Sequence, residues 1–460
     1  MSREYLKIDK LEGPLIILSD VIGASYGEII NIKVKDEKDR MGKVIRIDGN
    51  TVVAQVFEGT SGLSTNNTSI RFTGKPFEMA MSLGILGRSF DGVGRAIDGA
   101  GQIYDGKFFN INGRPINPVA RKYPRNFIQT GISTIDTLTT LIRGQKLPVF
   151  SGNGLPHNEL ASQIVRQAKL GEDTEDIKFA IVFAAIGVKH DDAAYFMRSF
   201  EEAGISDHVV SFVNLADDPI VERVSTPRCA LTAAEYLAFE EGYQILVVMT
   251  DITSYCEALR EIASAREEVP SRKGYPGYLY SDLASLYERA GMMKEKEGSI
   301  TFLPMLTMPN DDISHPIPDL TGYITEGQIV LARDLFQDNI YPPVSVLPSL
   351  SRLMKDGIGE GFTTKEHPDL SNQLFSSYSK VQDIRSLAQI IGEDDLSEVD
   401  KKYMEFGRQF EAKFVKQKND ENRSIKESLK IGWKVISVLP KTELDRLSSE
   451  VIEEFYIEEK

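Results

Sequence analysis

Apolar and polar residues alternate over short segments in the first part of the chain. The alternation is visible in TVVAQVFEGT (51–60) and recurs in GEIINIKVKD (27–36) and GKVIRID (42–48). Turn-forming residues such as DGN lie between these segments. Such alternation is typical of strands with one buried face. Short strands at close spacing predict a small β-barrel over residues 1–75.

The pattern changes over residues 76–355, where apolar residues form continuous runs. The runs are FAIVFAAIG (179–187), VVSFVNLA (209–216), QILVVMTD (244–251) and SITFLPMLTM (299–308). Continuous runs indicate parallel strands that are buried on both faces. Helix-like patterns lie between them at 191–204, 232–242 and 254–268. This alternation of strands and helices predicts an α/β domain with a mostly parallel sheet.

Residues 356–460 have a helical pattern. One apolar stripe has spacings of three and four residues: Tyr403, Phe406, Phe410 and Phe414. Ser424 and Glu427 form a capping-box pair that opens a further helix, which we expect Pro440 to close. The apolar stripe of this helix is Ile425, Leu429, Trp433 and Ile436. The fold class predicted from the pattern is therefore multidomain: an N-terminal β-barrel, a central α/β domain and a C-terminal helical domain.

Composition narrows the possible functions. The 460 residues suggest about three domains, and 53 basic against 68 acidic residues give a net charge of −15. Nucleic-acid binding requires clustered positive charge, so we expect no nucleic-acid partner. The five histidines lack the spacing of a zinc site, so we expect no metal site.

The segments that would direct a protein to a membrane or to an oxidising compartment are missing from the sequence. Two cysteines are too few for a disulfide framework, which favours the cytoplasm. The first residues, MSREYLKIDK, lack an apolar signal core. No apolar run approaches the roughly 20 residues of a membrane span. We therefore expect a soluble chain that associates with a membrane only through partners.

One segment resembles a phosphate-binding loop that has lost its reactive residues. It follows the strand-like run KLPVF (146–150) and precedes the helix-like run ELASQIVRQAKL (159–170). The segment consists of Ser151, Gly152, Asn153, Gly154, Leu155, Pro156, His157 and Asn158. The pattern G-x-x-x-x-G-K-[ST] requires Gly, Gly, Lys and Ser or Thr where this chain has Ser151, Pro156, His157 and Asn158.

Each replacement weakens the chemistry of such a loop. His157 does not supply the fixed positive charge of a lysine beside the phosphates. Asn158 lacks the hydroxyl that binds Mg²⁺, and Pro156 removes one backbone N–H. Gly152 and Gly154 keep the turn. Taken alone, the segment is equally compatible with a phosphate-binding loop that has lost its reactive residues and with an ordinary glycine-rich turn between strand and helix.

Two further features favour a domain that is related to nucleotide hydrolases but has lost the hydrolytic activity. Asp251 ends an apolar strand, where a carboxylate can lie near Mg²⁺, although such an Asp often only caps the next helix. A hydrolytic core also needs an acid to position water after the run FAAIG, but no acid follows until Asp191. The segment GVGRAIDG (92–99) resembles a dinucleotide fingerprint, but it follows no clear parallel strand and we expect turns there.

Longer motifs resemble the B subunit of the V/A-type rotary ATPases over nearly the whole chain. They are QTGISTIDTLTTLIRGQKLPVFSGNGLPHNE (129–159), TPRCALTAAEYLAFEEG (226–242), GYPGYLYSDLASLYERAG (274–291), HPIPDLTGYITEGQIVLAR (315–333) and YPPVSVLPSLSRLM (341–354). The resemblance implies that the central domain is RecA-like. It also implies a hexameric head of alternating A and B subunits, expected as 3:3, with catalytic ATP or ADP and Mg²⁺ at an interface with the A subunit. The loop of the B subunit lies at the other interface and is non-catalytic.

The resemblance assigns Arg352, in PSLSRLM, as an arginine finger that reaches the nucleotide of the neighbouring A subunit. Arginine suits this role because its planar, permanently charged fork makes paired bonds to phosphate oxygens. An arginine paired with a nearby carboxylate is the ordinary alternative. The chain departs mildly from the family at Ser345, Ser271 and Lys273, which can alter local turns.

The resemblance also implies partners and a location. They are the catalytic A subunit, the central shaft and the peripheral stalk, on the cytoplasmic face of a membrane. The acidic segment GEDDLSEVD (392–400) resembles a loop near the shaft, or it is simply a solvated surface.

The sequence does not distinguish proton from sodium coupling, or ATP synthesis from hydrolysis. Two alternatives are a self-sufficient ATPase and a Rho-type helicase; the missing lysine opposes the first, and the acidic charge opposes the second.

Overall fold

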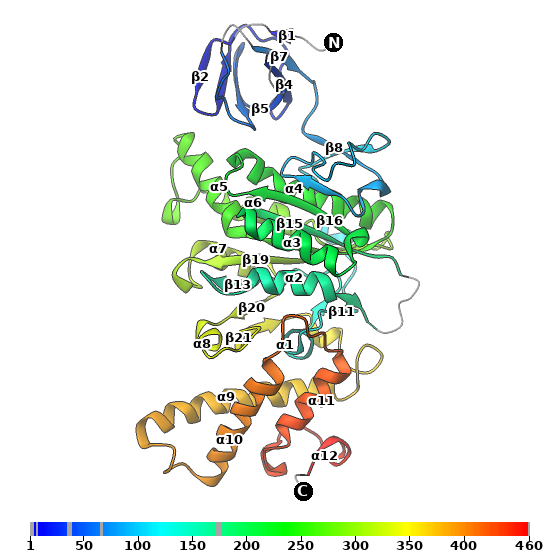
Figure 1. Cartoon of the computed structure of the whole chain (residues 1–460), viewed down its shortest axis with the longest axis vertical. Coiled ribbons are helices and arrows are strands. Elements are labelled where there is room, and N and C mark those ends of the chain that lie inside the picture. The colour runs from blue at the N-terminus through cyan, green and yellow to red at the C-terminus, as the bar shows by residue number, and fades with distance from the viewer. Residues whose placement is uncertain (1–3, 6–7, 35–38, 65–67, 172–176, 459–460) are drawn as a thin grey trace.

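The computed structural model describes residues 4–5, 8–34, 39–64, 68–171 and 177–458. The end of the strand expected at 27–36 and the last two residues of the expected helical domain lie outside this part. Figure 1 shows three successive bodies along the long axis: an N-terminal β-sheet body, a central α/β body and a C-terminal helical body. The fold class expected from the sequence is confirmed.

The N-terminal body is an antiparallel sheet around its own apolar core. Its strands are β1 (Glu4–Tyr5), β2 (Lys10–Glu12), β3 (Leu15–Leu18), β4 (Ile29–Val34), β5 (Arg40–Asp48), β6 (Thr51–Val56) and β7 (Thr68–Phe72), in the order β1-β7-β4-β5-β6-β3-β2. Alternate side chains of β3, β5 and β7 are buried, for example Ile16, Val44 and Ile70. The alternating pattern therefore marks the buried face, as expected for strands of period two.

The central body is built on one large sheet with the order β21-β20-β13-β19-β17-β15-β16-β9. Its strands are β9 (Ser89–Asp91), β13 (Val149–Gly152), β15 (Phe179–Val188), β16 (Val209–Leu215), β17 (Gln244–Thr250), β19 (Ser299–Met308), β20 (Gly327–Leu331) and β21 (Val344–Ser351), with β18 (Gly291–Met292) beside β19. All pairs are parallel except those of β21 with β20 and of β18 with β19. The prediction of a mostly parallel sheet is confirmed.

Helices cover both faces of this sheet, which explains why its strands are apolar throughout. The helices are α1 (Ser133–Leu138), α2 (His157–Gln167), α3 (His190–Glu202), α4 (Ile220–Glu235), α5 (Ile252–Ala265), α6 (Leu279–Tyr287), α7 (Pro316–Ile324) and α8 (Arg333–Gln337). One face packs on α2 and α3 through residues such as Leu160 and Phe196. The other face packs on α4, α5 and α6 through residues such as Leu231, Tyr255 and Leu283.

Small strands complete the central body, and the sequence pattern did not predict them. They are β8 (Glu78–Met81) with β10 (Lys107–Asn110), and β12 (Leu141–Ile142), β11 (Phe127–Gln129) and β14 (Lys169–Leu170) in a second small sheet. The expectation that GVGRAIDG follows no parallel strand was wrong, because β9 pairs in parallel with β16. The expected turns are present, however, and no helix begins between residues 92 and 99.

The C-terminal body contains α9 (His367–Ile391), α10 (Glu398–Gln409), α11 (Ile425–Ile436) and α12 (Ser449–Phe455). All residues of the two predicted stripes are buried. The capping box of Ser424 and Glu427 is present in both directions. The helix ends at Ile436 with Ser437 as its cap, so it stops before Pro440.

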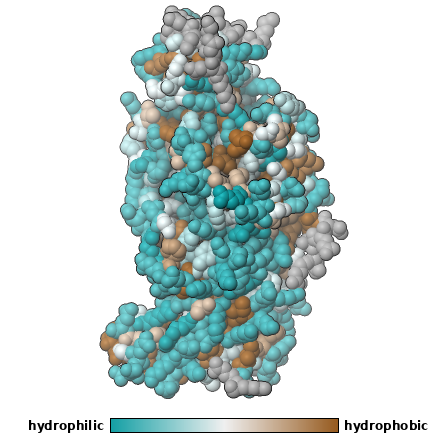
Figure 2. Space-filling model, in the orientation of Figure 1, coloured by the Kyte–Doolittle hydropathy of each residue, from teal (hydrophilic) through white to brown (hydrophobic). Residues whose placement is uncertain are grey.

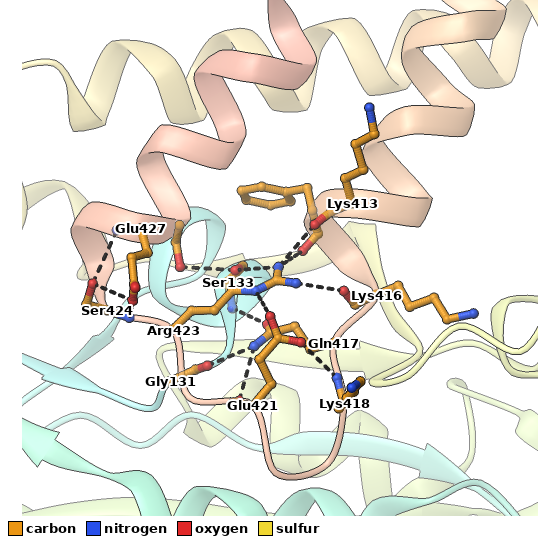
Figure 3. A network of polar contacts seen from close by, with 12 residues as sticks. Gly131, Ser133, Lys413, Lys416, Gln417, Lys418, Glu421, Arg423, Ser424 and Glu427 are labelled. Carbon is orange, nitrogen blue, oxygen red and sulfur yellow. Dashed lines mark hydrogen bonds and ion pairs between the residues drawn. The ribbon is translucent and has the colours of Figure 1, made fainter.

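A buried arginine joins the C-terminal body to the central body (Figure 3). Arg423 donates to Ser133 Oγ of α1 at 3.1 Å and to the backbone carbonyls of Lys413, Phe414 and Lys416. Its Nε also bonds the Glu421 carboxylate at 2.6 Å. A charged group with this many partners is fully satisfied although it is buried. The network therefore fixes the chain where the two bodies meet.

Candidate functional site

The loop of residues 151–158 lies at the carboxyl end of β13 and leads directly into α2. Gly154 has φ +77°, a left-handed conformation that favours glycine, and Leu155 N–H donates to Gly152 O at 3.1 Å. Leu155 and Pro156 are buried, whereas His157 and Asn158 are partly exposed. The strand, turn and helix of a phosphate loop are thus all present.

The side chains that replace the reactive residues bond to the loop itself or to a neighbouring strand. His157 Nδ1 lies 3.1 Å from Leu155 O and 3.2 Å from Ser151 Oγ. Asn158 Oδ1 accepts a hydrogen bond from Thr250 Oγ1 at 3.2 Å. Both positions that hold phosphate and Mg²⁺ in an intact loop are therefore engaged within the protein.

An ion pair that the sequence analysis missed also contacts this loop. Arg333, at the start of α8, bonds both carboxylate oxygens of Asp311 at 2.7 and 2.9 Å. Its Nη2 also donates to Asn153 O at 2.9 Å. A side chain at Gly152 would clash with Asp311, so the pair lies directly against the turn. Both residues follow strands adjacent to β13, and this position at the carboxyl edge is the signal that could have identified them.

Asp251 lies at the end of β17 and acts as the N-cap of α5. One carboxylate oxygen accepts from Thr253 N–H at 2.7 Å and from Thr307 N–H at 3.1 Å. The other oxygen accepts from the Thr307 hydroxyl. The sequence left open whether Asp251 caps the helix that follows its strand. The structure shows that it does.

No carboxylate occupies the position after FAAIG. Gly187 has φ +66°, its N–H donates to Asn214 Oδ1 at 3.1 Å, and Val188 is buried. Arg223 Nε bonds the same Asn214 oxygen at 3.1 Å. Asp191 lies in the first turn of α3, beyond this position. In the described part of the chain, Asp191 is therefore the first acid to follow this position.

The side chains in and around the loop decide whether it fits Mg²⁺ and a triphosphate. The loop offers no lysine and no hydroxyl at its end, and the two charged groups beside it, Asp311 and Arg333, are paired with each other. The donor set therefore does not fit a magnesium nucleotide bound for hydrolysis.

Arg352 lies far from this loop, at the opposite edge of the sheet. Its backbone N–H donates to Glu326 O at 2.9 Å, and the preceding Ser351 pairs with Gly327 at the amino end of β20. The five residues of β20 separate the two edges by about 13 Å of strand. Arg352 is exposed, and within the described residues its guanidinium has no hydrogen bond or ion pair. This side chain cannot serve the loop of its own chain.

The acidic segment lies between α9 and α10, which project from the C-terminal body as a hairpin (Figure 1). Glu393, Asp394, Asp395 and Glu398 are all exposed, whereas Leu396 is buried. Ser397 caps α10 by accepting from Asp400 N–H at 3.1 Å. The segment is therefore an ordered turn that presents carboxylates to solvent.

The departures from the family motifs have local effects only. Lys273 has φ +53° in a short turn, and its ammonium bonds Asp312 at 3.1 Å. Ser345 O accepts a hydrogen bond from the Ser349 hydroxyl within β21. Ser271 is exposed and begins the turn that contains Lys273.

Three further features concern the surface, the helices and the distribution of possible metal ligands. The face in Figure 2 is mainly hydrophilic, with apolar residues in small patches. Across the described ranges, no helix is long and apolar enough to cross a membrane. In the same ranges, no group of three or more His, Cys, Asp or Glu side chains could hold a metal ion.

Family models match three consecutive segments of the chain. The model for the nucleotide-binding domain of the ATP synthase alpha/beta family matches residues 131–351. The beta-barrel domain of the same family matches residues 11–74. The C-terminal domain of V and A type ATP synthase matches residues 356–456.

Curated relatives match along their whole length. The chain is 67% identical over 456 residues to V-type ATP synthase beta chain 2 of Clostridium tetani, covering 99% of each chain. It is 54% identical to the B subunit of the A-type ATP synthase of Nitrosopumilus maritimus, covering 99% of this chain and 98% of that one. Among solved structures, an ATP synthase subunit named NeqB from Nanoarcheaum equitans superimposes with a TM-score of 0.73 at 41% identity, covering 92% of this chain and 98% of that chain.

Proposed function

The chain belongs to the ATP synthase alpha/beta family as a V/A-type B (beta) chain, and on this basis we propose that it is the non-catalytic subunit of a rotary head. In the proposed head it alternates with a catalytic A subunit, expected as 3:3. The head couples ATP synthesis or hydrolysis to transport of protons or sodium. It contacts a central shaft and a peripheral stalk and lies on the cytoplasmic face of a membrane.

The observation that carries this proposal is the separation of Arg352 from the loop of its own chain. An exposed guanidinium without a partner among the described residues keeps all of its N–H donors available for an anion on a neighbouring subunit. In the proposal, Arg352 reaches the γ-phosphate of an ATP molecule that the A subunit holds with Mg²⁺. There it stabilises the charge that spreads over the phosphate oxygens in the transition state.

The loop of residues 151–158 has a different role in the proposal. Arg333 and Asp311 fix its turn, and His157 and Asn158 bond internally. The loop therefore acts as a rigid wall of the second, non-catalytic interface. Asp251 contributes by holding α5 in place as its cap. No step of hydrolysis is assigned to these residues.

The decisive experiment co-expresses this chain with its cognate A subunit. Arg352→Ala is expected to leave the assembled ring intact and to lower ATP turnover by about 10³-fold or more, the usual effect of a lost finger. Arg352→Lys is expected to remain strongly impaired, because lysine cannot make the paired bonds. Lys355→Ala, an exposed cation three positions away, is the matched control and should retain turnover.

Three results would count against the proposal. Near-normal turnover by an assembled ring with Arg352→Ala would remove this residue from the site. Rapid hydrolysis of Mg·ATP by the isolated chain would show that it is a self-sufficient ATPase. Retention on single-stranded RNA at physiological salt would support the helicase alternative instead.

The acidic segment is assigned to the shaft in the same proposal. Replacing Glu393, Asp394, Asp395 and Glu398 by neutral amides is expected to change torque or the ion-coupling ratio modestly. Glu450 and Glu453, exposed acids on α12, provide the control when neutralised in the same way. Unchanged rotation records for the quadruple variant would identify the segment as ordinary surface.

A further inference from the structure

A cavity of about 370 Å³ lies between the N-terminal body and the central body. Strands β5 and β6 form one wall through Lys43, Ile45 and Gln55. Helices α4, α5 and α6 form the other, together with the residues just after α5. Tyr26 and Tyr278, which are both exposed, also line the cavity. None of the residues of the loop 151–158 lines this cavity, so the two are separate features of the chain.

Three cationic side chains line this cavity: Lys43, Arg228 and Arg266. Among the described residues, the acidic groups in the lining are Asp282 and Glu268. The local charge is therefore positive, in a chain whose net charge is −15. An acidic protein that gathers three cations around one cavity concentrates a positive potential there.

The two arginines have partners that leave part of each guanidinium available. Arg228 bonds Asp282 at 2.7 Å, and Asp282 also accepts a hydrogen bond from the buried Tyr255 hydroxyl. Arg266 donates to Gln55 Oε1 at 3.2 Å and lies 3.7 Å from Glu268. Each guanidinium has five N–H donors, more than these contacts use.

Lys43 differs from the arginines because its ammonium has no ion pair or side-chain hydrogen bond with any described residue. The side chain is partly buried on β5. Burial lowers the pKa of Lys43, and the positive charges of Arg228 and Arg266 lower it further, whereas Asp282 opposes the shift. A second anion near Lys43 would relieve this repulsion.

We propose that this cavity binds a compact polyanion of the phosphate class, held by Lys43 from the N-terminal body and by Arg228 and Arg266 from the central body. The forked donors of arginine match the geometry of phosphate oxygens, and lysine adds a point charge. Gln55, whose Oε1 already accepts from Arg266, has amide N–H groups left to donate. A bound anion would bridge the two bodies and stiffen the junction between them.

Inorganic pyrophosphate is the probe, because it is compact and carries several negative charges. Titration of the full chain by calorimetry and by phosphorus NMR is expected to show one saturable site without added Mg²⁺. Lys43→Met keeps the packed stem and removes the charge, so it should weaken binding about tenfold or more. Arg266→Gln should weaken it similarly. Lys33→Met, at an exposed lysine on β4, is the matched control and should bind like the unmodified chain.

A second measurement uses the unmodified chain and needs no variant. The pKa of the Lys43 ammonium, followed by NMR of the labelled chain, should rise when pyrophosphate binds. Failure to bind, or equal binding by the Lys43→Met variant, would overturn the proposal. Arg352→Ala should bind pyrophosphate normally, so this test is independent of the role proposed for Arg352.

Discussion

Lowering the pH is expected to weaken the junction between the central and C-terminal bodies through His367. This residue begins α9 and is fully buried. Its Nε2 lies 2.9 Å from Thr137 O of α1, and its Nδ1 lies 3.0 Å from Thr363 Oγ1. The carbonyl can only accept, so Nε2 carries the proton and Nδ1 accepts from the hydroxyl. A second proton on the ring would break this arrangement.

The size of the effect follows from the pKa of His367. Burial lowers this pKa from 6.5 to about 4, despite the opposing hydrogen bond to Thr137. The full shift corresponds to about 3.4 kcal/mol. The stabilisation is complete above the unfolded pKa and is lost as the pH falls from 6.5 toward about 4, because only the unfolded chain takes up the proton in that range. At a pH of about 5 the loss is roughly 2 kcal/mol.

Urea denaturation at a series of pH values, with a probe in the C-terminal body, measures this loss. His367→Gln can still donate to Thr137 O but does not titrate. The variant should therefore lose about 2 kcal/mol less than the unmodified chain between pH of about 7 and about 5. His208→Gln, at an exposed position, is the control and should follow the unmodified chain. Equal pH slopes for His367→Gln and the unmodified chain, or a ring that titrates near 6.5 by NMR, would refute the reasoning.

Three further substitutions test individual contacts by denaturation. Gly298→Ala should cost about 1–3 kcal/mol because the added carbon clashes with the backbone of Ala238 and Tyr243, whereas Gly277→Ala, which meets open space, should change stability by less than about 0.5 kcal/mol. Arg423→Leu should cost about 3–5 kcal/mol because several buried carbonyls lose their donor. Arg289→Met should cost a similar amount, about 3–5 kcal/mol, since this fully buried guanidinium is removed from its carboxylate partner.

The sequence was most informative where the pattern alone determines burial. The stripe from Tyr403 to Phe414 and the capping box at Ser424 depend on residues three or four positions apart, so local spacing predicts them. The continuous runs of the central sheet are similar, because strands covered by helices on both faces must be apolar throughout. The loop of residues 151–158 was located by the same logic, as the turn after one such strand.

Other features depend on contacts that no local pattern encodes. Strand β9 has three residues, and its pairing with β16 joins segments that are more than a hundred positions apart. Arg333 and Asp311 are also far in the sequence from the loop that they contact. The two residues meet at this loop only because β19 and β20 both lie next to β13 in the sheet. The burial of Arg289 could not be predicted from the local sequence either, because its carboxylate partner, Glu235, lies 54 positions away in the chain. Pairings of this kind become visible only when the order of the strands is known.

Helix α2 connects the loop of residues 151–158 to the C-terminal body. Helix α2 begins at this loop, and Gln163 on α2 donates to the carbonyls of Lys418 and Glu421 at 3.1 and 3.0 Å. Arg166 on the same helix donates to Asn419 O at 2.8 Å. The segment that these bonds hold leads to Arg423, which anchors the C-terminal body. A displacement of α2 would therefore be transmitted through these bonds to the segment that precedes Arg423.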